Sequence, residues 1–124
     1  MKRVLVVDDS LLIREVARIS LERAGGFAVQ TAESGSEGLA AAVVSRPDAI
    51  LLDVVMPDMD GPATVHALRT HGATREIPVV LVTGRDKDED RRAFGALGVA
   101  GVINKPFEAG ALADQVCEVL GWER

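Results

Sequence analysis

Five short apolar runs rich in β-branched residues recur along the chain, and each is followed by a segment with helical periodicity. The runs do not alternate apolar with polar residues, as expected for strands that are covered on both faces of a parallel sheet. Strict alternation of such strands with helices predicts a parallel α/β sheet with right-handed crossovers. Five units predict an open, doubly wound sheet, because a closed barrel would need eight. The predicted strands cover residues 3–8, 27–31, 49–53, 78–83 and 98–103.

The segments between the runs carry signals for the start and the end of helices. The first has its apolar residues on one 3.6-residue face and stops at Gly25 and Gly26, where the backbone can adopt a positive φ. The sequence S-G-S-E at residues 34–37 has the capping-box form, and Pro62 suits the first turn of a later helix. The predicted helices cover residues 13–24, 34–44, 62 to about 71, 86–97 and 107–120.

The size and composition of the chain are those of one globular domain. Its 124 residues can build one hydrophobic core, so we expect residues 1–124 to form a single domain. No apolar run is long enough to cross a bilayer, and no leader precedes Val4. Cys117 is the single cysteine, and we expect it to be a small buried residue of a helix. The lack of a possible internal disulfide, together with these features, favours a cytoplasmic protein.

The charge pattern argues against direct binding of nucleic acid. The chain has 14 Lys and Arg against 19 Asp and Glu, and no basic stripe is present. It also has one Trp and no Tyr, which removes the usual platform for stacking bases.

Polar residues stand at the carboxyl ends of four predicted strands. In an open α/β sheet, ligands bind at this edge, where the strand order reverses. Segments that are far apart in the sequence are therefore expected to meet in one cleft. These residues are Asp8 and Asp9 after the first strand, Asp53 after the third, Thr83 after the fourth and Lys105 after the fifth.

Three carboxylates in one cleft indicate a cation site. They repel one another, and one would stay protonated unless a cation lay between them. Oxygen ligands favour Mg²⁺ over Zn²⁺, which prefers His or Cys. An alternative remains open for Asp8 and Asp9, which could simply be helix-capping acids. Asp53 weakens that alternative, because a carboxylate directly after A-I-L-L is badly placed for solubility alone.

The remaining residues at this edge could bind a phosphoryl group. Lys105 could be only a salt-bridge partner, or it could bind a phosphoryl oxygen as a point charge. Thr83 could donate a hydroxyl and Gly84 its backbone amide to further oxygens. Positioning and charge neutralisation are most of what phosphoryl transfer requires of a protein.

Four motifs in order resemble the receiver domain of two-component response regulators, over nearly the whole chain. They are V-L-V-V-D-D-S at residues 4–10, I-L-L-D-V-V-M-P-D-M-D-G at 50–61, V-V-L-V-T-G at 79–84 and N-K-P-F at 104–107. The resemblance implies a flavodoxin-like sheet of strand order 2-1-3-4-5 with helices on both faces. It also implies a cis peptide bond between Lys105 and Pro106.

The resemblance implies a role for each residue at the edge. Asp53 would accept a phosphoryl group from the phosphohistidine of a sensor kinase or phosphotransfer protein, or from a small donor such as acetyl phosphate. Asp9, Asp53 and the backbone carbonyl of Val55 would ligate Mg²⁺, and Asp8 would act partly through water. Lys105 would hold the phosphoryl group, and Thr83 would move toward it on activation.

The same resemblance implies a signalling module. It would catalyse its own phosphorylation and dephosphorylation without being a turnover enzyme, and an effector or output domain would read its altered conformation.

The chain departs from common receiver patterns in two places. Val102 stands where many members have an aromatic residue that follows the threonine, so we expect the signal to use the segment from Gly84 to Arg92 instead. G-V-A-G at residues 98–101 lacks the acids that commonly support one family dimer. Val55 and Arg85 stand at positions that influence the access of water to the phosphoryl group in this family.

Three other functions are less consistent with the residues. A haloacid-dehalogenase-type phosphatase would need an acid two residues after Asp53, where Val55 stands. A flavodoxin-like cofactor binder would need a phosphate cradle in place of Asp8 and Asp9. A receiver that keeps only the fold would not need the complete set of site residues.

Two histidines and three apolar residues have roles that the sequence leaves more open. His66 and His71 could suggest a phosphorelay, but we expect both to be solvated on or just after the third helix. Phe94, Leu97 and Phe107 are candidates for either the core or a partner surface.

Overall fold

The chain folds into one parallel sheet with helices on both faces. A computed structural model describes residues 1–84 and 88–123, and the side chains of 88–91 are not among those described. The five strands have the order β2-β1-β3-β4-β5, which confirms the predicted doubly wound sheet. The strands are β1 (Arg3–Val7), β2 (Ala28–Ala32), β3 (Ala49–Asp53), β4 (Val79–Thr83) and β5 (Gly101–Asn104).

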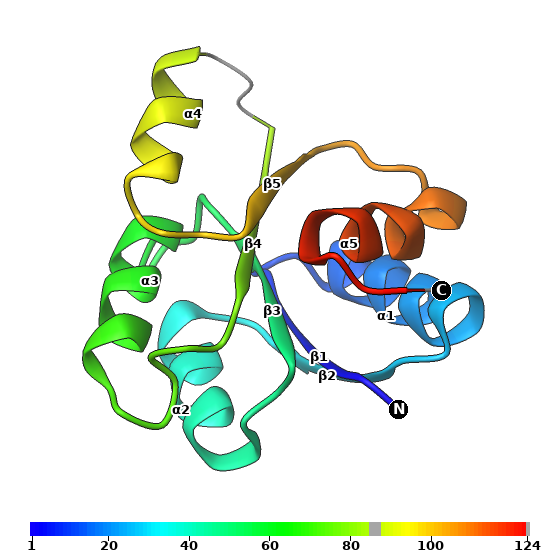
Figure 1. Ribbon diagram of the computed structural model, residues 1–124, viewed down its shortest axis with the longest axis horizontal. Coiled ribbons are helices and arrows are strands. Elements are labelled where there is room, and N and C mark those ends of the chain that lie inside the picture. The colour runs from blue at the N-terminus through cyan, green and yellow to red at the C-terminus, as the bar shows by residue number, and fades with distance from the viewer. Residues whose placement is uncertain (85–87, 124) are drawn as a thin grey trace.

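The helices lie in two layers (Figure 1). Helices α1 and α5 cover one face of the sheet, and α2, α3 and α4 lie on the other. The bounds are α1 (Leu11–Gly25), α2 (Gly35–Ser45), α3 (Gly61–Thr70), α4 (Asp88–Gly95) and α5 (Leu112–Leu120), with a short 3-10 turn, η1 (Ala109–Ala111), before α5.

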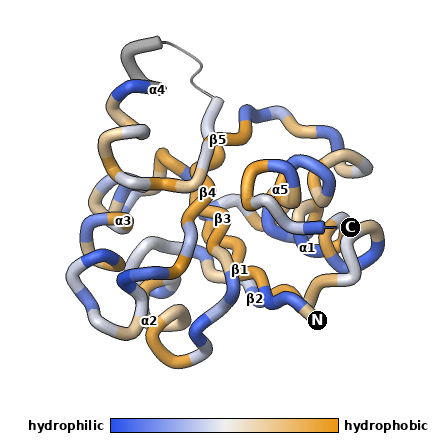
Figure 2. Tube along the Cα trace, in the orientation of Figure 1, coloured by the Kyte–Doolittle hydropathy of each residue, from blue (hydrophilic) through white to orange (hydrophobic). Residues whose placement is uncertain are grey.

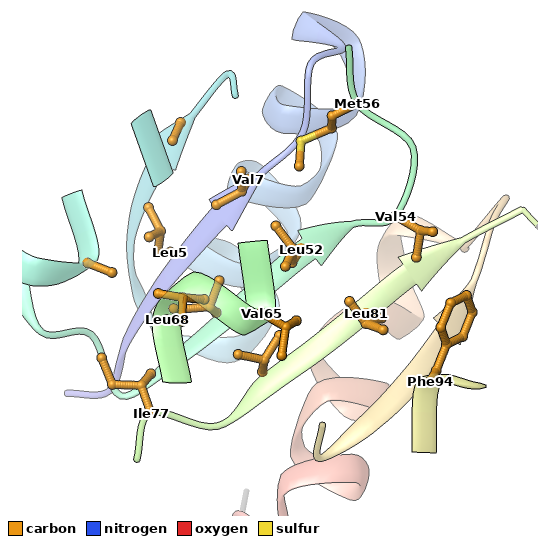
Figure 3. Packing of buried hydrophobic residues seen from close by; sticks show 14 residues of the cluster. Leu5, Val7, Leu52, Val54, Met56, Val65, Leu68, Ile77, Leu81 and Phe94 are labelled. Atoms are coloured by element: carbon orange, nitrogen blue, oxygen red, sulfur yellow. The ribbon is translucent and has the colours of Figure 1, made fainter. Parts of the chain in front are cut away.

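Alternate residues of each central strand point into two separate cores. On β1, Leu5 and Val7 belong to the core beneath α2, α3 and α4, whereas Val4 and Val6 face the opposite core. All residues of β3 and β4 are buried, which explains why these runs contain no polar alternation. Figure 3 shows the first core from close by, and Figure 2 shows that hydrophobic residues concentrate along the central strands. Each fully buried Val or Leu contributes roughly 1.5–3 kcal/mol.

Side-chain caps fix the starts of three helices. The Ser10 hydroxyl accepts a hydrogen bond from the Ile13 amide, and Ser34 accepts one from Glu37, as the S-x-x-E pattern predicts. The Asp60 carboxylate accepts one from the Ala63 amide at the start of α3. These caps place three loops at the carboxyl edge of the sheet.

Gly61 allows α3 to begin directly against the end of β3. A Cβ atom at this position would lie 2.9 Å from the Val54 Cα and 3.1 Å from the Asp53 carbonyl oxygen. Both atoms belong to the backbone and cannot rotate away, so a larger residue would push the loop after Asp53 outward.

Two predicted starts are wrong by three residues or more. Strand β5 begins at Gly101 and not at residue 98, because Gly98 has a φ of 73° and turns the chain after α4. Helix α5 begins at Leu112 and not at residue 107, because Gly110 weakens helix formation and no side chain caps the turn at Ala111.

Other residues lie where the sequence predicts them. Cys117 is buried on α5, and His66 and His71 are exposed on α3 and directly after it. The bond between Lys105 and Pro106 is cis. Among the residues that the structure describes, no helix is long and apolar enough to cross a membrane.

The three apolar residues whose role the sequence left undecided, Phe94, Leu97 and Phe107, differ in burial. Phe94 is 5% exposed and belongs to the first core, with Leu97 packed partly against it. Phe107 is half-buried against the second core.

Candidate functional site

Three acidic side chains meet where β1 and β3 end. These two strands are neighbours and pair Val7 with Leu52, so the residues that follow, Asp8 and Asp53, stand side by side. Asp8, Asp9 and Asp53 each offer a carboxylate oxygen, and all three oxygens lie within 4.8 Å of one another. Asp8 and Asp53 are buried, whereas Asp9 is exposed.

Lys105 joins this cluster from the far side of β4. Its Nζ donates to Asp8 Oδ2 at 2.8 Å and to Asp53 Oδ1 at 3.1 Å. Its backbone N–H donates to the Thr83 carbonyl at 2.7 Å, which ties the segment after β5 to the end of β4. The ammonium group therefore bridges two of the three carboxylates.

The ionisation of Asp53 and Lys105 reflects burial and mutual attraction. Burial raises the pKa of Asp53, and the charge of Asp8 adds to this increase, while Lys105 and the Val55 backbone amide oppose it. Burial lowers the pKa of Lys105, but its hydrogen bonds to Asp8 and Asp53 outweigh that effect and leave the pKa above its usual value. Lys105 is therefore charged at neutral pH and favours the ionised form of Asp53.

The other predicted site residues surround this cluster. Thr83 is the last residue of β4 and is 1% exposed, and the exposed Gly84 follows it. The Val55 side chain is 64% exposed just after Asp53, and its backbone contacts that carboxylate through the amide. Arg85, and with it part of the segment from 84 to 92 that was predicted to carry the signal, lies outside the described residues.

A residue that the sequence interpretation missed, Arg14 on α1, supports Asp8 from behind. Its Nη1 donates to the Asp8 backbone carbonyl at 2.8 Å, and its side chain is 13% exposed. Arg14 shares a helix face with Ala17 and Leu21, both of them buried. A charged residue on that otherwise apolar face is the signal that could have identified it.

Asp58 was also missed, and it links the loop after β3 to the start of α2. Its carboxylate accepts hydrogen bonds from the backbone amides of Gly35 and Ser36 and from the Ser36 hydroxyl. These bonds, that of the Ser36 hydroxyl first, lower the pKa of Asp58 to about 2. In the sequence Asp58 lies three residues before Gly61, the first residue of α3, and nothing in that position indicates a contact with α2.

The donor set of the acidic cluster fits a hard divalent cation. Its ligand atoms are carboxylate oxygens, and the cluster contains no His or Cys. Mg²⁺ prefers such oxygen ligands and keeps several waters, whereas Zn²⁺ would require nitrogen or sulfur. The residues present therefore suit Mg²⁺.

Together, the fold and the site define a class of protein. The sheet is flavodoxin-like, and its carboxyl edge carries acids and a lysine in place of a cradle for a nucleotide cofactor. This combination is typical of modules that handle a phosphoryl group with the help of a cation.

Comparison with known proteins identifies the family. Residues 4–117 match the response regulator receiver domain. The chain is 41% identical over 104 residues to the probable transcriptional regulatory protein TcrX of Mycobacterium tuberculosis, covering 84% of this chain and 43% of that protein. It is 39% identical over 105 residues to response regulator MprA of Mycolicibacterium vanbaalenii, covering 85% and 44%. The chain therefore spans somewhat less than half the length of these relatives.

A solved structure supports the same assignment over the full fold. Chemotaxis protein CheY4 of Vibrio cholerae superposes with a TM-score of 0.89 at 35% identity, covering 96% of this chain and 98% of that one. The chain belongs to the response regulator receiver domain family. It is a receiver domain, a module of phosphoacceptor signalling.

Proposed function

We propose that Asp53 is the phosphoacceptor of this receiver domain and that residues 1–124 act as one signalling unit. The observation that carries the proposal is the position of the Asp53 carboxylate. It is buried at the end of β3, 3.1 Å from the Lys105 ammonium and in one cluster with Asp8 and Asp9. Asp8 is the other buried carboxylate of this cluster, but both of its oxygens already accept hydrogen bonds, Oδ1 from the Ser10 amide and Oδ2 from Lys105.

The geometry suits attack by Asp53 on a phosphoryl donor. An Asp53 oxygen would form a bond to phosphorus as the bond to the donor's nitrogen, or to the acyl oxygen of acetyl phosphate, breaks. Lys105 already reaches Asp53 and could turn to a phosphoryl oxygen, while the Thr83 hydroxyl and the Gly84 amide could serve others. Mg²⁺ held by Asp9, Asp53 and the Val55 carbonyl, with Asp8 acting partly through water, would neutralise charge on the transferred group.

The proposal includes partners and a location. A sensor histidine kinase or phosphotransfer protein would supply the phosphoryl group, and an effector or output domain would read the altered conformation. The name of one relative, TcrX, describes a transcriptional regulatory protein. For this chain we propose reception of the signal without contact with nucleic acid, since its net charge is -5. A cytoplasmic location goes with the proposal, because kinases that use ATP would act there.

The proposal also limits the chemistry of the protein. The domain would catalyse its own phosphorylation and the loss of its phosphoryl group, but it would not turn over phosphomonoesters. The exposed Val55 stands where a phosphatase of the haloacid-dehalogenase type would need an acid. Steady release of phosphate from a phosphomonoester would contradict this part.

Phosphorylation with acetyl phosphate, with and without Mg²⁺, tests the proposal. Wild type should gain the mass of one phosphoryl group only with Mg²⁺, and hydroxylamine should remove it as expected for an acyl phosphate. Asp53→Asn should gain none. Asp58→Asn is the matched control, since Asp58 lies in the same loop but outside the cluster. If Asp53→Asn gains the same mass as wild type, the assignment of Asp53 is wrong.

A further inference from the structure

Arg14 is a cation held next to the acidic cluster, yet its hydrogen bond goes to a backbone carbonyl of the cluster and not to a carboxylate. Its Nη1 lies 2.8 Å from the Asp8 carbonyl oxygen, and its Nη2 lies 3.9 Å from Glu33 Oε2. The side chain is 13% exposed, whereas that of Glu33 is 69% exposed. The buried contact with Asp8 therefore determines the position of the guanidinium, and the distant ion pair contributes little.

The carbonyl that Arg14 holds belongs to the peptide between Asp8 and Asp9. Its orientation therefore sets the direction in which the chain presents Asp9. The Asp8 side chain has its own supports, since Ser10 N–H donates to Oδ1 at 2.9 Å and Lys105 Nζ donates to Oδ2 at 2.8 Å. Within the described part of the chain, the exposed Asp9 carboxylate has no hydrogen bond or ion pair.

We infer that Arg14 is a positioning residue for the cation site, which acts by fixing the peptide between Asp8 and Asp9 so that Asp9 stays within reach of an ion. The inference rests on the proposed function. A hydrogen bond from a charged donor is stronger than one between neutral groups, and groups that orient metal ligands commonly change metal affinity by 10-fold or more.

The sign of the effect separates positioning from simple electrostatics. The charge of Arg14 repels a divalent cation, so an electrostatic role alone predicts that its removal tightens Mg²⁺ binding. Loss of the carbonyl contact predicts weaker binding, because Asp9 then samples orientations away from the ion. Substitution of Arg14 by a neutral residue therefore gives opposite results under the two interpretations.

The test is the Mg²⁺ dissociation constant, measured by following the backbone amide resonances of Asp9 and Ser10 during a titration. Arg14→Gln should bind Mg²⁺ about 10-fold more weakly than wild type. Arg14→Lys, which keeps the charge and one donor, should lose less. Arg18→Gln is the matched control on α1 and should leave the affinity unchanged, because within the described residues Arg18 pairs with Glu15 and Glu22 and with no residue of the acidic cluster.

Two further readouts exclude a general loss of structure. In the absence of Mg²⁺, Arg14→Gln should broaden or shift the Asp9 amide resonance while the resonances of β3 and β4 stay in place. At saturating Mg²⁺, its rate of phosphorylation by acetyl phosphate should approach that of wild type. If Arg14→Gln does not fold, Arg14→Met, which keeps the aliphatic stem and removes the charge and the donors, takes its place, and an Mg²⁺ affinity equal to wild type would then overturn the inference.

The possible outcomes separate the inference from the proposed function. Equal or tighter Mg²⁺ binding by a folded Arg14→Gln overturns the role of Arg14 alone. Failure of wild type itself to bind Mg²⁺ in a saturable manner overturns both.

Discussion

Lys105 holds together two carboxylates that would otherwise repel each other. We therefore expect it to weaken Mg²⁺ binding and to speed phosphorylation. Its ammonium competes with a cation for Asp8 and Asp53, at 2.8 and 3.1 Å respectively. Lys105→Gln should therefore bind Mg²⁺ about 3- to 10-fold more tightly. Its phosphorylation at saturating Mg²⁺ should be about 100-fold slower, because a charge that stabilises the transferred group is lost.

The two effects are measured by amide titration and by the rate of mass gain with acetyl phosphate. Lys2→Gln serves as the control, since Lys2 lies over the Trp122 ring and not at the acidic cluster. An unchanged phosphorylation rate in Lys105→Gln would show that Lys105 only neutralises the acids.

Asp58 makes the stability of the protein depend on acid pH. Hydrogen bonds, that of the Ser36 hydroxyl first, lower its pKa to about 2 in the folded protein, below the value of about 3.9 expected in the unfolded chain. A lowered pKa contributes stability that is present above about pH 4 and is lost as the pH falls through about 2. Asp58→Asn should be less stable than wild type at pH 7, and this difference should shrink between about pH 4 and pH 2.

Urea unfolding of both proteins from pH 7 to pH 2 checks this prediction. Ser36→Ala removes the largest cause of the lowered pKa, so its acid-dependent loss of stability should be smaller than in wild type and should be complete at a higher pH. A difference between wild type and Asp58→Asn that stays constant down to pH 2 would contradict the prediction.

At the scale of elements, the Phe94 ring packs α4 against the sheet. Among the side chains described on this helix, Phe94 is buried, whereas Arg92, Ala93 and Gly95 are exposed. Figure 3 shows the ring beside β4, near Leu81 and Val54, in the core against which Val102 also packs. Phe94 therefore gives an aromatic ring from α4 to the core against which Val102 packs.

Phe94→Ala should destabilise the protein by about 3–5 kcal/mol, because it removes a buried aromatic ring. Urea unfolding measures this loss, and hydrogen exchange should show that the amides of α4 lose protection before those of β3 and β4. Val44→Ala, at a side chain that is 85% exposed, should change stability by less than about 0.5 kcal/mol. A cost below about 1 kcal/mol for Phe94→Ala would show that other contacts hold α4.

The sequence predicted which elements form better than where two of them begin. Strands β3 and β4 are nearly continuous apolar runs, and their predicted bounds match the structure to within one residue. The start of β5 follows the positive φ of Gly98, and the start of α5 follows the short 3-10 turn that contains Gly110; the residues on both sides of each glycine are apolar. Apolar periodicity cannot locate the start of a strand or helix when a glycine sets that start and the periodic pattern does not change there.

At the scale of the molecule, topology explains why the acidic cluster could be predicted and its supports could not. Parallel strands bring their carboxyl ends to one edge, so Asp8, Asp53 and Lys105 were expected to converge. Arg14 and Asp58 act through hydrogen bonds that cross between elements, to the Asp8 carbonyl and to the α2 amides. Such contacts depend on how a helix and a loop pack against the sheet, which the residue pattern does not reveal.

A cation bound at one edge should stabilise the whole fold, because its ligands come together only in the folded chain. Binding to the native state alone adds about 2.7 kcal/mol when the free Mg²⁺ concentration is 100 times its dissociation constant. For a chain of 124 residues this corresponds to a rise in Tm of roughly 10 °C. The experiment is thermal unfolding over a series of MgCl₂ concentrations, with NaCl at equal ionic strength because the net charge of -5 makes screening itself stabilising. Asp9→Asn should lose most of the specific increase while keeping the response to NaCl, and an equal rise in Tm with both salts would show that the acidic cluster does not bind Mg²⁺ specifically.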